Sequence, residues 1–457
     1  MHSDREENLS VDLTPTGDRG QVSIFRTCLW LFLFLLVVRL VIALVLKRDL
    51  SNDDDEVDRV AFALAGHLGF SNPFKIPTGP TSHVAPAYPL ILAGIYELFG
   101  RGTLGESVRQ ILSCSATSLQ FALLPALAIV AKIPRRVGIL AALLGGLSPL
   151  RHWIETKGTF ETPYTALLLV ILTIFTLQIW SLDQFSDKRA LCYGAMWGVA
   201  LLFAPNLLPI LFGYIAIGAF WFRTSLFNSY LRFSFMLLLA AAIVLMPWTM
   251  RNYYNFHRLI FVRGNLGLEL SVSNNDSAVP LFEDNLYTEG FQNIGPLSSQ
   301  LAAQAVERLG ESAYYHQQLL NAYHWIGSHP RKFLHLTADR VRYFWFPPLE
   351  PHIKGVISSL LTWCFTLVGI AGLFVMFQHH RGPALAITVI WLTYPLVYYL
   401  LQIDLRYRYP IEWTFLFGAS YGFFTAWDRL LVGILRKQDT DSSGRWVHEA
   451  SFKQECK

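Results

Sequence analysis

Long apolar runs separated by short polar connections constrain the fold of this chain more than any other feature of its sequence. A helix of about 20 apolar residues is long enough to cross the ~30 Å hydrocarbon layer of a membrane. About ten runs approach this length: residues 28–46, 107–131, 136–150, 162–180, 190–204, 205–222, 232–250, 354–377, 383–401 and 411–431. The pattern predicts an all-α polytopic membrane protein with about ten transmembrane helices, in a range of about nine to twelve.

The composition agrees with this prediction, because 53% of the residues are hydrophobic and only 15% are charged. One soluble core could not bury so much apolar surface. The formal net charge is +4, and Lys and Arg form short clusters instead of the basic stripe typical of nucleic-acid binding. The five cysteines show neither CxxC spacing nor the density of a secreted disulfide scaffold. A disulfide or zinc framework therefore has little support.

The Lys and Arg clusters predict the orientation, since short cytoplasmic loops carry an excess of positive charge. Clusters in residues 132–136, 188–189 and 223–232 assign these connections and both termini to the cytoplasm. This orientation requires that the apolar stretch 88–99 does not cross the membrane. At about twelve residues the stretch suits a juxtamembrane or re-entrant helix. A short true span with reversed N-terminal topology is the alternative.

The predicted topology divides the chain into successive segments and shows no internal repeat of the kind found in transporters built from two halves. Juxtamembrane helices are expected in the first outer loop. The segments are a disordered cytoplasmic tail (1–27), an N-terminal membrane module (28–250) with an outer loop (47–106), a small extracytoplasmic subdomain (251–353), C-terminal membrane helices (354–431) and a cytoplasmic tail (432–457).

Four consecutive acids, Asp53, Asp54, Asp55 and Glu56, follow the first apolar run. Carboxylates this close repel one another, which raises some of their pKa values and can create a general base or a cation site. Asp54, Asp55 and Glu56 are therefore candidate catalytic residues, and Asp53 is a candidate substrate ligand. The four permit Mg²⁺ or Mn²⁺ without requiring either metal. The alternative is a solvated loop that caps the next helix.

Two further segments offer candidate substrate-binding residues. Residues 77–90 contain four prolines, which exclude a regular helix and can hold His83 and Tyr88 in place over the membrane. Arg406 and Arg408 lie between the last two runs and point the same way if that segment is extended, so both suit phosphate oxygens. The alternatives are an ordinary connector for the first segment and cations that reach lipid headgroups for the second.

Few charges lie within or beside the apolar runs. Arg39 lies inside the first run, where a buried ion costs roughly 2.5–3.5 kcal/mol on insertion scales, so we expect it to face protein or a lipid phosphate. Glu161 ends an outer turn that also holds Arg151, Glu155 and Lys157. Glu161 is a candidate to line one cavity together with the other substrate-binding candidates. The alternative is that it caps a helix at the membrane interface.

These stretches together resemble the GT-C superfamily of membrane glycosyltransferases, in particular bacterial relatives of protein O-mannosyltransferases and of the aminoarabinose transferase for lipid A. Residues 55–71 look like the acidic first outer loop of that family, and residues 80–100 look like its Pro-Thr and Tyr-Pro stretch with a Phe-Gly helix end. Residues 247–252 (PWTMRN) are similar to the Pro-Trp-x-x-Arg-Asn that opens its large outer loop. Residues 406–410 (RYRYP) are similar to its Arg-Tyr-Arg-x-Pro element.

The resemblance implies inverting transfer of a sugar from a polyprenyl-phosphate donor to an extracytoplasmic acceptor on a lipid, glycan or protein. An outer-loop carboxylate would be the base, with Glu56 or Asp54 favoured here. Arg406 and Arg408 would bind the leaving phosphate, and Arg251 is a further substrate-binding candidate. Val57, where relatives often have an aromatic residue, departs from the pattern and leaves the base assignment open.

The resemblance also implies a multi-pass protein of the bacterial inner membrane with its active site on the extracytoplasmic side. The expected partners are the lipid-linked donor, membrane lipids and the acceptor, with no nucleic acid. The alternative function is a transporter or lipid flippase that binds an ion or headgroup with the same charges. Transporters tend to place charges near the bilayer midplane, whereas these charges gather at one predicted surface. A non-catalytic membrane scaffold is a third possibility.

Overall fold

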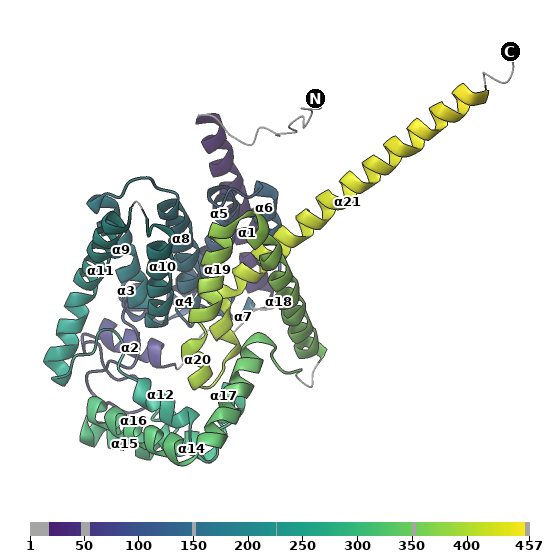
Figure 1. The fold of residues 1–457 in the computed structure, drawn as a ribbon. Coiled ribbons are helices and arrows are strands. Elements are labelled where there is room, and N and C mark those ends of the chain that lie inside the picture. The colour runs from purple at the N-terminus through teal and green to yellow at the C-terminus, as the bar shows by residue number, and fades with distance from the viewer. Residues whose placement is uncertain (1–17, 47–54, 149–151, 225, 350–352, 453–457) are drawn as a thin grey trace.

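The computed structural model describes residues 18–46, 55–148, 152–224, 226–349 and 353–452 (Figure 1). These residues form helices and contain no strand, apart from isolated β-bridges. Six helices or helix pairs among them are long and apolar enough to cross a membrane. The prediction of an all-α polytopic membrane protein is confirmed.

The six candidate spans match six of the predicted apolar runs. They are α1 (Asp18–Leu46), α4 with α5 (Thr103–Ala122 and Leu124–Val130), α8 (Thr162–Trp180), α11 (Phe227–Phe256), α18 (Ile353–His379), and α19 with α20 (Arg381–Thr393 and Leu396–Leu400). The other four runs lie in α6 (Arg135–Gly146), α9 (Asp187–Phe203), η2 with α10 (Pro205–Leu207 and Leu208–Trp221), and α21 (Tyr409–Phe452). Each of the ten runs thus contains helix within the described residues, and the crossing of the last four stays a prediction.

The ends of several helices differ from the expected segment boundaries. Helix α1 begins at Asp18, so residues 18–27 are helical where the sequence suggested a disordered tail. Helix α21 continues to Phe452, beyond the expected end of the last span. Helix α11 continues through Pro247 to Phe256, because a membrane helix tolerates proline when neighbouring groups satisfy the freed carbonyl. The remaining domain boundaries stay predictions.

The outer loop after α1 is built from α2 (Glu56–Ala65) and α3 (Ala87–Phe99), which pack against each other. Asp55 caps α2, since its carboxylate accepts a 2.7 Å hydrogen bond from the backbone N–H of Glu56. Helix α2 buries Val57 and Val60 in the main core. The apolar stretch 88–99 is therefore helical as predicted, and it is too short to rank among the candidate spans.

Six helices after α11 form the predicted outer subdomain, and they gather at one end of the molecule beside α2 (Figure 1). Phe74, Leu268, Val272, Val306 and Tyr315 belong to a separate hydrophobic cluster that holds them together. Helix α1 begins at the opposite end (Figure 1). The six are α12 (Leu266–Ser273), α13 (Phe282–Asn285), α14 (Glu289–Ile294), α15 (Gln300–Leu309), α16 (Glu311–Ser328) and α17 (Pro330–Trp345).

Backbone hydrogen bonds attach the subdomain to the segment that follows α20. The N–H of Phe282 donates to the carbonyl of Ile403 at 2.8 Å, and the N–H of Ile403 donates to the carbonyl of Pro280 at 2.8 Å. The Arg340 guanidinium donates to the carbonyl of Leu400 at 3.0 Å. The chain between α20 and α21 is therefore fixed against the subdomain, close to α12.

Candidate active site

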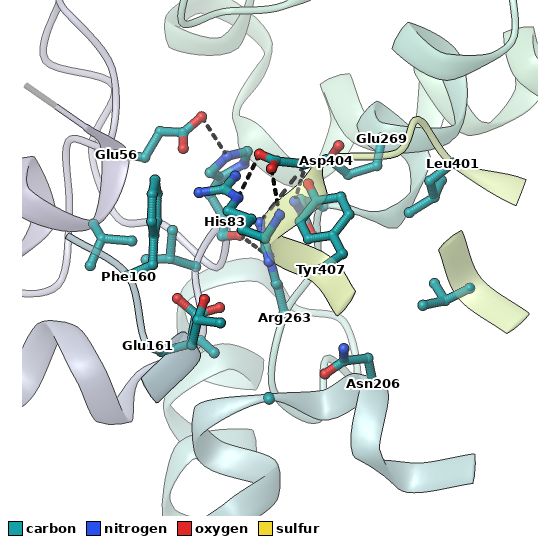
Figure 2. A pocket seen from close by; sticks show the side chains of 18 of the residues that line it. Glu56, His83, Phe160, Glu161, Asn206, Arg263, Glu269, Leu401, Asp404 and Tyr407 are labelled. Atoms are coloured by element: carbon teal, nitrogen blue, oxygen red, sulfur yellow. Dashed lines mark hydrogen bonds and ion pairs between the residues drawn. The ribbon is translucent and has the colours of Figure 1, made fainter. Parts of the chain in front are cut away.

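A cavity of about 700 Å³ lies between the outer loop, the subdomain and the segment after α20 (Figure 2). This volume is in the range of pockets that hold small molecules. Segments far apart in the sequence contribute to its wall. The predicted site residues that line it are Asp55, Glu56, His83, Tyr88, Glu161 and Arg406. The early carboxylates and a late arginine thus meet in one cavity.

The two described acids of the cluster occupy the start of α2. Asp53 and Asp54 lie outside the described residues, so the structure places only Asp55 and Glu56. The exposed fraction of the Glu56 side chain is 24%, and the residue lines the cavity. The Asp55 carboxylate is held at the cap of α2 by the N–H of Glu56. Glu56 is therefore the better placed of the two to meet a substrate.

Glu56 and His83 point toward one another across the cavity wall (Figure 2). The His83 Nε2 atom lies 3.3 Å from Glu56 Oε1, and His83 Nδ1 lies 2.7 Å from the Tyr315 hydroxyl. Burial alone would raise the pKa of Glu56, but the hydrogen bond from His83 and attraction to nearby cationic groups, Arg263 among them, outweigh it, so the pKa of Glu56 lies below its ordinary value. Glu56 is therefore ionised at neutral pH.

The neighbouring Asp55 has the opposite shift. Burial, and then repulsion by the Glu56 carboxylate, raise the pKa of Asp55 above its ordinary value, while attraction to Arg406 partly offsets the rise. Two adjacent carboxyl groups of this kind titrate as a pair, in which one holds a proton while the other is ionised. The pair therefore presents one ready acceptor of a proton, on Glu56.

Arg406 faces the carboxylates from the segment after α20. Its Nε atom forms a 2.8 Å ion pair with Asp404, and its guanidinium lies 3.7 Å from the centre of the Phe160 ring. Burial opposes its charge, but Asp404, Asp55 and other anionic groups outweigh burial and raise the pKa of Arg406. About 17% of its side chain is exposed. A permanent cation thus borders the cavity.

Arg408 and Arg251 do not line the cavity. Arg408 is 3% exposed and donates to the carbonyl of Trp345 at 2.8 Å and to the hydroxyl of Thr366 at 2.6 Å. The segment forms the 3₁₀ helix η3 (Leu405–Arg408) and is not extended. Side chains two residues apart therefore point in different directions. The prediction that Arg406 and Arg408 point the same way is wrong. Arg251 donates to two backbone carbonyls, Thr81 and Phe70, each at 2.6 Å.

Tyr88 and Glu161 border the cavity in different ways. Tyr88 is 1% exposed, and its hydroxyl already donates to the carbonyl of Gly158, so its surface contributes shape more than hydrogen bonds. Glu161 precedes α8 without capping it through its side chain. Within the part of the chain that the structure describes, the Glu161 carboxylate forms no hydrogen bond or ion pair, although its charge acts on Arg406. It remains available to a ligand.

The cavity also contains residues that the sequence did not single out. Arg263, just before α12, donates to the carbonyl of His83 at 2.6 Å and lies 3.8 Å from Glu269. Tyr407 stacks on Tyr398 with ring centres 4.5 Å apart. Proximity to the Arg-Tyr-Arg motif could have pointed to Asp404 and Tyr407, but no motif marks Arg263 or Glu269. Among the described residues, no group of three or more His, Cys, Asp or Glu side chains forms a metal site.

No protein-family model and no curated protein sequence matches the chain. Solved structures do match its fold. The archaeal oligosaccharyltransferase AglB from Archaeoglobus fulgidus, in complex with an inhibitory peptide and a dolichol-phosphate, aligns with a TM-score of 0.50 and 14% identity over 89% of this chain and 52% of that one. The chain thus spans about half the length of AglB.

Two further structures match less well. The apo form of the Archaeoglobus fulgidus oligosaccharyltransferase has a TM-score of 0.49 at 15% identity and covers 89% of this chain and 52% of that chain. ArnT from Cupriavidus metallidurans, bound to undecaprenyl phosphate, has a TM-score of 0.37 at 14% identity and covers 89% and 78%. At such identity the match shows the fold alone: this chain shares the fold of the part of AglB with which it aligns.

Proposed function

We propose that the chain is a membrane glycosyltransferase that moves a sugar from a polyprenyl-phosphate donor to a hydroxyl of an extracytoplasmic acceptor. One observation carries this proposal: Glu56, an ionised carboxylate, and Arg406, a permanent cation, line the same cavity. The reaction needs a base for the attacking hydroxyl and a cation for the leaving phosphate. AglB, whose fold the chain shares, is described in complex with a dolichol-phosphate, which supports a lipid phosphate as the leaving group.

In the proposed reaction Glu56 accepts the proton of the acceptor hydroxyl as the oxygen attacks the anomeric carbon. The bond between this carbon and the phosphate oxygen breaks, and the lipid phosphate leaves with the electron pair. Arg406 stabilises the charge that grows on the phosphate through its guanidinium donors. Attack from the face opposite the phosphate inverts the configuration of the sugar. Asp54 remains a candidate base from the sequence alone.

The extracytoplasmic position of this site is part of the proposal. Lys132 lies between α5 and α6, and Arg135 and Arg136 begin α6; both helices lie at the end of the molecule opposite α12 to α16 (Figure 1). Positive charge in short loops marks the cytoplasmic side. The subdomain and the cavity would then face the other side, in a bacterial inner membrane, where lipid-linked sugars meet extracytoplasmic acceptors.

Binding of the leaving group is the first arm of the test, because it does not depend on which sugar the donor carries. Purified full-length protein in nanodiscs should bind undecaprenyl phosphate, measured by quenching of tryptophan fluorescence. The Arg406→Ala variant should bind it on the order of tenfold or more weakly, because it loses a charge-assisted contact to phosphate. Equal binding by the variant would contradict the assigned role of Arg406.

Transfer of the sugar is the second arm. The same nanodiscs receive undecaprenyl-phosphate mannose with tritium in the sugar, together with a membrane extract as acceptor, and water-soluble and acceptor-bound label are counted. We expect release or transfer by the natural chain and a strongly reduced rate in Glu56→Gln, while the variant Glu97→Gln, which changes an exposed carboxylate on α3, stays active. Movement of the intact donor between leaflets of liposomes, without loss of label, would instead support a flippase.

A further inference from the structure

One face of α16 in the outer subdomain is turned toward the segment that carries His83. Glu311 and Tyr315 are four residues apart, so their side chains lie on the same side of the helix. Each is only 3% exposed. Both contact residues 81–83, which belong to the outer loop more than 200 positions earlier in the chain. These contacts join α16 to His83, the partner of Glu56, and to the two residues before it.

Glu311 fixes the backbone immediately before His83. Its carboxylate accepts from the N–H of Ser82 at 2.6 Å, from the hydroxyl of Ser82 at 2.8 Å, and from the hydroxyl of Thr81. Burial raises the pKa of Glu311, and the nearby His83 and these donors oppose that rise. Hydrogen bonds to a buried carboxylate are strong and directional. Residues 81 and 82 are therefore held in one conformation.

Tyr315 fixes the imidazole itself. Its hydroxyl lies 2.7 Å from His83 Nδ1, and the opposite ring nitrogen lies 3.3 Å from Glu56 Oε1. An ionised carboxylate only accepts hydrogen bonds, so Nε2 must donate to Glu56, and a neutral imidazole must then accept at Nδ1. The Tyr315 hydroxyl can donate this hydrogen bond, because burial holds its pKa well above the ordinary value and the hydroxyl therefore keeps its proton. Of the two neutral tautomers of His83, these contacts therefore favour the one protonated at Nε2.

From these contacts we infer that the outer subdomain positions the proposed base, through Glu311 and Tyr315 of α16 acting on His83. The inference rests on the proposed function and deepens it. His83 is 2% exposed and packs its ring edge-on against Phe74 at 5.2 Å between centres, so it cannot turn freely. Tyr315 and Glu311 are positioning residues, since they touch His83 or its backbone and not the cavity. The subdomain is therefore part of the machinery that keeps Glu56 ionised and oriented.

Tyr314 provides a matched control for Tyr315. The two tyrosines are neighbours in α16 and are similarly buried, at 5% and 3% exposure. The Tyr314 hydroxyl donates at 2.8 Å to the carbonyl of Ile294, within the subdomain. Tyr314→Phe therefore removes one hydrogen bond from the same helix without touching His83. Any general loosening of the subdomain should affect both variants.

The first readout is the rate of label transfer from undecaprenyl-phosphate mannose by full-length protein in nanodiscs across a range of pH. We expect Tyr315→Phe to lower kcat on the order of 10- to 100-fold, as misplacement of a catalytic group does, with an unchanged KM for the donor. Its acid limb should move to higher pH, because Glu56 loses the support of an oriented His83. Tyr314→Phe should keep both the rate and the profile of the natural chain.

The second readout does not need activity. Ring ¹⁵N resonances of His83, assigned by their loss in His83→Gln, report its tautomer by solid-state NMR. We expect Tyr315→Phe to shift the Nδ1 resonance and to mix the tautomers, and Glu311→Gln to broaden both resonances, while Tyr314→Phe leaves them unchanged. If Tyr315→Phe matches Tyr314→Phe in this spectrum, the inference is overturned. An inactive natural chain with the expected spectra would refute the proposed function and leave the positioning intact.

Discussion

Two ionic clusters among the described residues differ in their access to the cavity: one is enclosed between helices, and the other lines the cavity. The buried cluster consists of Arg39, Glu155, His152 and Tyr409, which join α1, α7 (His152–Lys157) and α21. Arg39 Nε lies 3.1 Å from Glu155, His152 Nδ1 also lies 3.1 Å from it, and the Tyr409 hydroxyl donates to it at 3.0 Å. Arg39 is fully buried, as expected for an ion inside the first apolar run.

The cavity cluster consists of Asp55, Glu56, His83, Asp404 and Arg406. Its ion pairs, at 3.3 Å for Glu56 with His83 and 2.8 Å for Arg406 with Asp404, are similar in length to those of the buried cluster, but Glu56 and Arg406 remain 24% and 17% exposed. The difference teaches that short ion pairs do not by themselves mark a site. Charges enclosed among helices fix the fold, whereas charges with one open side can exchange a protein partner for a substrate.

Removal of the proposed base should have the largest effect on the cavity side of this comparison. Glu56→Gln keeps the size and packing of the side chain but removes its ability to accept a proton. We expect sugar transfer to fall by a factor on the order of 10² to 10⁴, the usual contribution of general base catalysis, with an unchanged melting temperature. Steady-state transfer assays and thermal unfolding in detergent check this. Retained transfer would show that the base lies elsewhere.

Removal of the central carboxylate should have the largest effect on the buried side. Glu155→Ala leaves Arg39 without its partner inside the helices, and breaking a buried pair in this way costs about 3–5 kcal/mol. We expect a large drop in the melting temperature, which thermal unfolding experiments measure. Below the lowered melting temperature, the variant should bind the donor normally. A variant that unfolds like the natural chain but fails to bind undecaprenyl phosphate would contradict the division into two clusters.

The two arginines of the Arg-Tyr-Arg motif allow the same comparison between a cavity residue, Arg406, and a buried residue, Arg408. Arg406→Ala should weaken binding of undecaprenyl phosphate by about 1.5–3 kcal/mol, the usual contribution of hydrogen bonds to charged groups, with little change in stability. Arg408→Ala should lower stability instead, because it leaves the buried carbonyl of Trp345 and the hydroxyl of Thr366 without their donor. Fluorescence titration measures lipid binding by both variants, and thermal unfolding measures their stability. If the two variants lose binding and stability to the same extent, the proposed difference between Arg406 and Arg408 is wrong.

The smallest expected effect is on the pH dependence of transfer. Because the folded pKa of Glu56 is lowered, its stabilising contribution is complete above the ordinary pKa of glutamate and is lost only as the pH falls through the lower folded value. Activity should therefore persist below that ordinary value. The raised pKa of Asp55 predicts a second, shallower inflection above its ordinary value.

Asp55→Asn isolates that second inflection. Asparagine keeps an oxygen that can cap α2 and removes the titration. We expect the variant to lose the upper inflection in a pH–rate profile, with a change in rate of only a few-fold, and to keep the lower one. If the upper inflection persists in the variant, Asp55 is not its source.

The sequence predicted those features that depend on local pattern. Apolar runs marked the helices because span length is set by the membrane, and the acidic stretch marked Asp55 and Glu56 at the start of α2. Contacts between distant segments carry no local signal. Tyr315 and Arg263 could not be found in this way, because they act on His83 from another part of the fold. The prediction that Arg408 binds the phosphate beside Arg406 assumed an extended backbone, whereas the segment forms a 3₁₀ helix.

The central claim is that the cavity faces the extracytoplasmic side, and cysteine accessibility tests it most directly. In a chain without its five native cysteines, single cysteines are placed at Leu68 after α2, at Tyr287 in the subdomain and at Asp183 between α8 and α9, all exposed. A membrane-impermeant maleimide added to right-side-out vesicles should label the first two at once and the third only after permeabilisation. Labelling of Leu68→Cys and Tyr287→Cys from opposite sides, or of both only after permeabilisation, would contradict the claim.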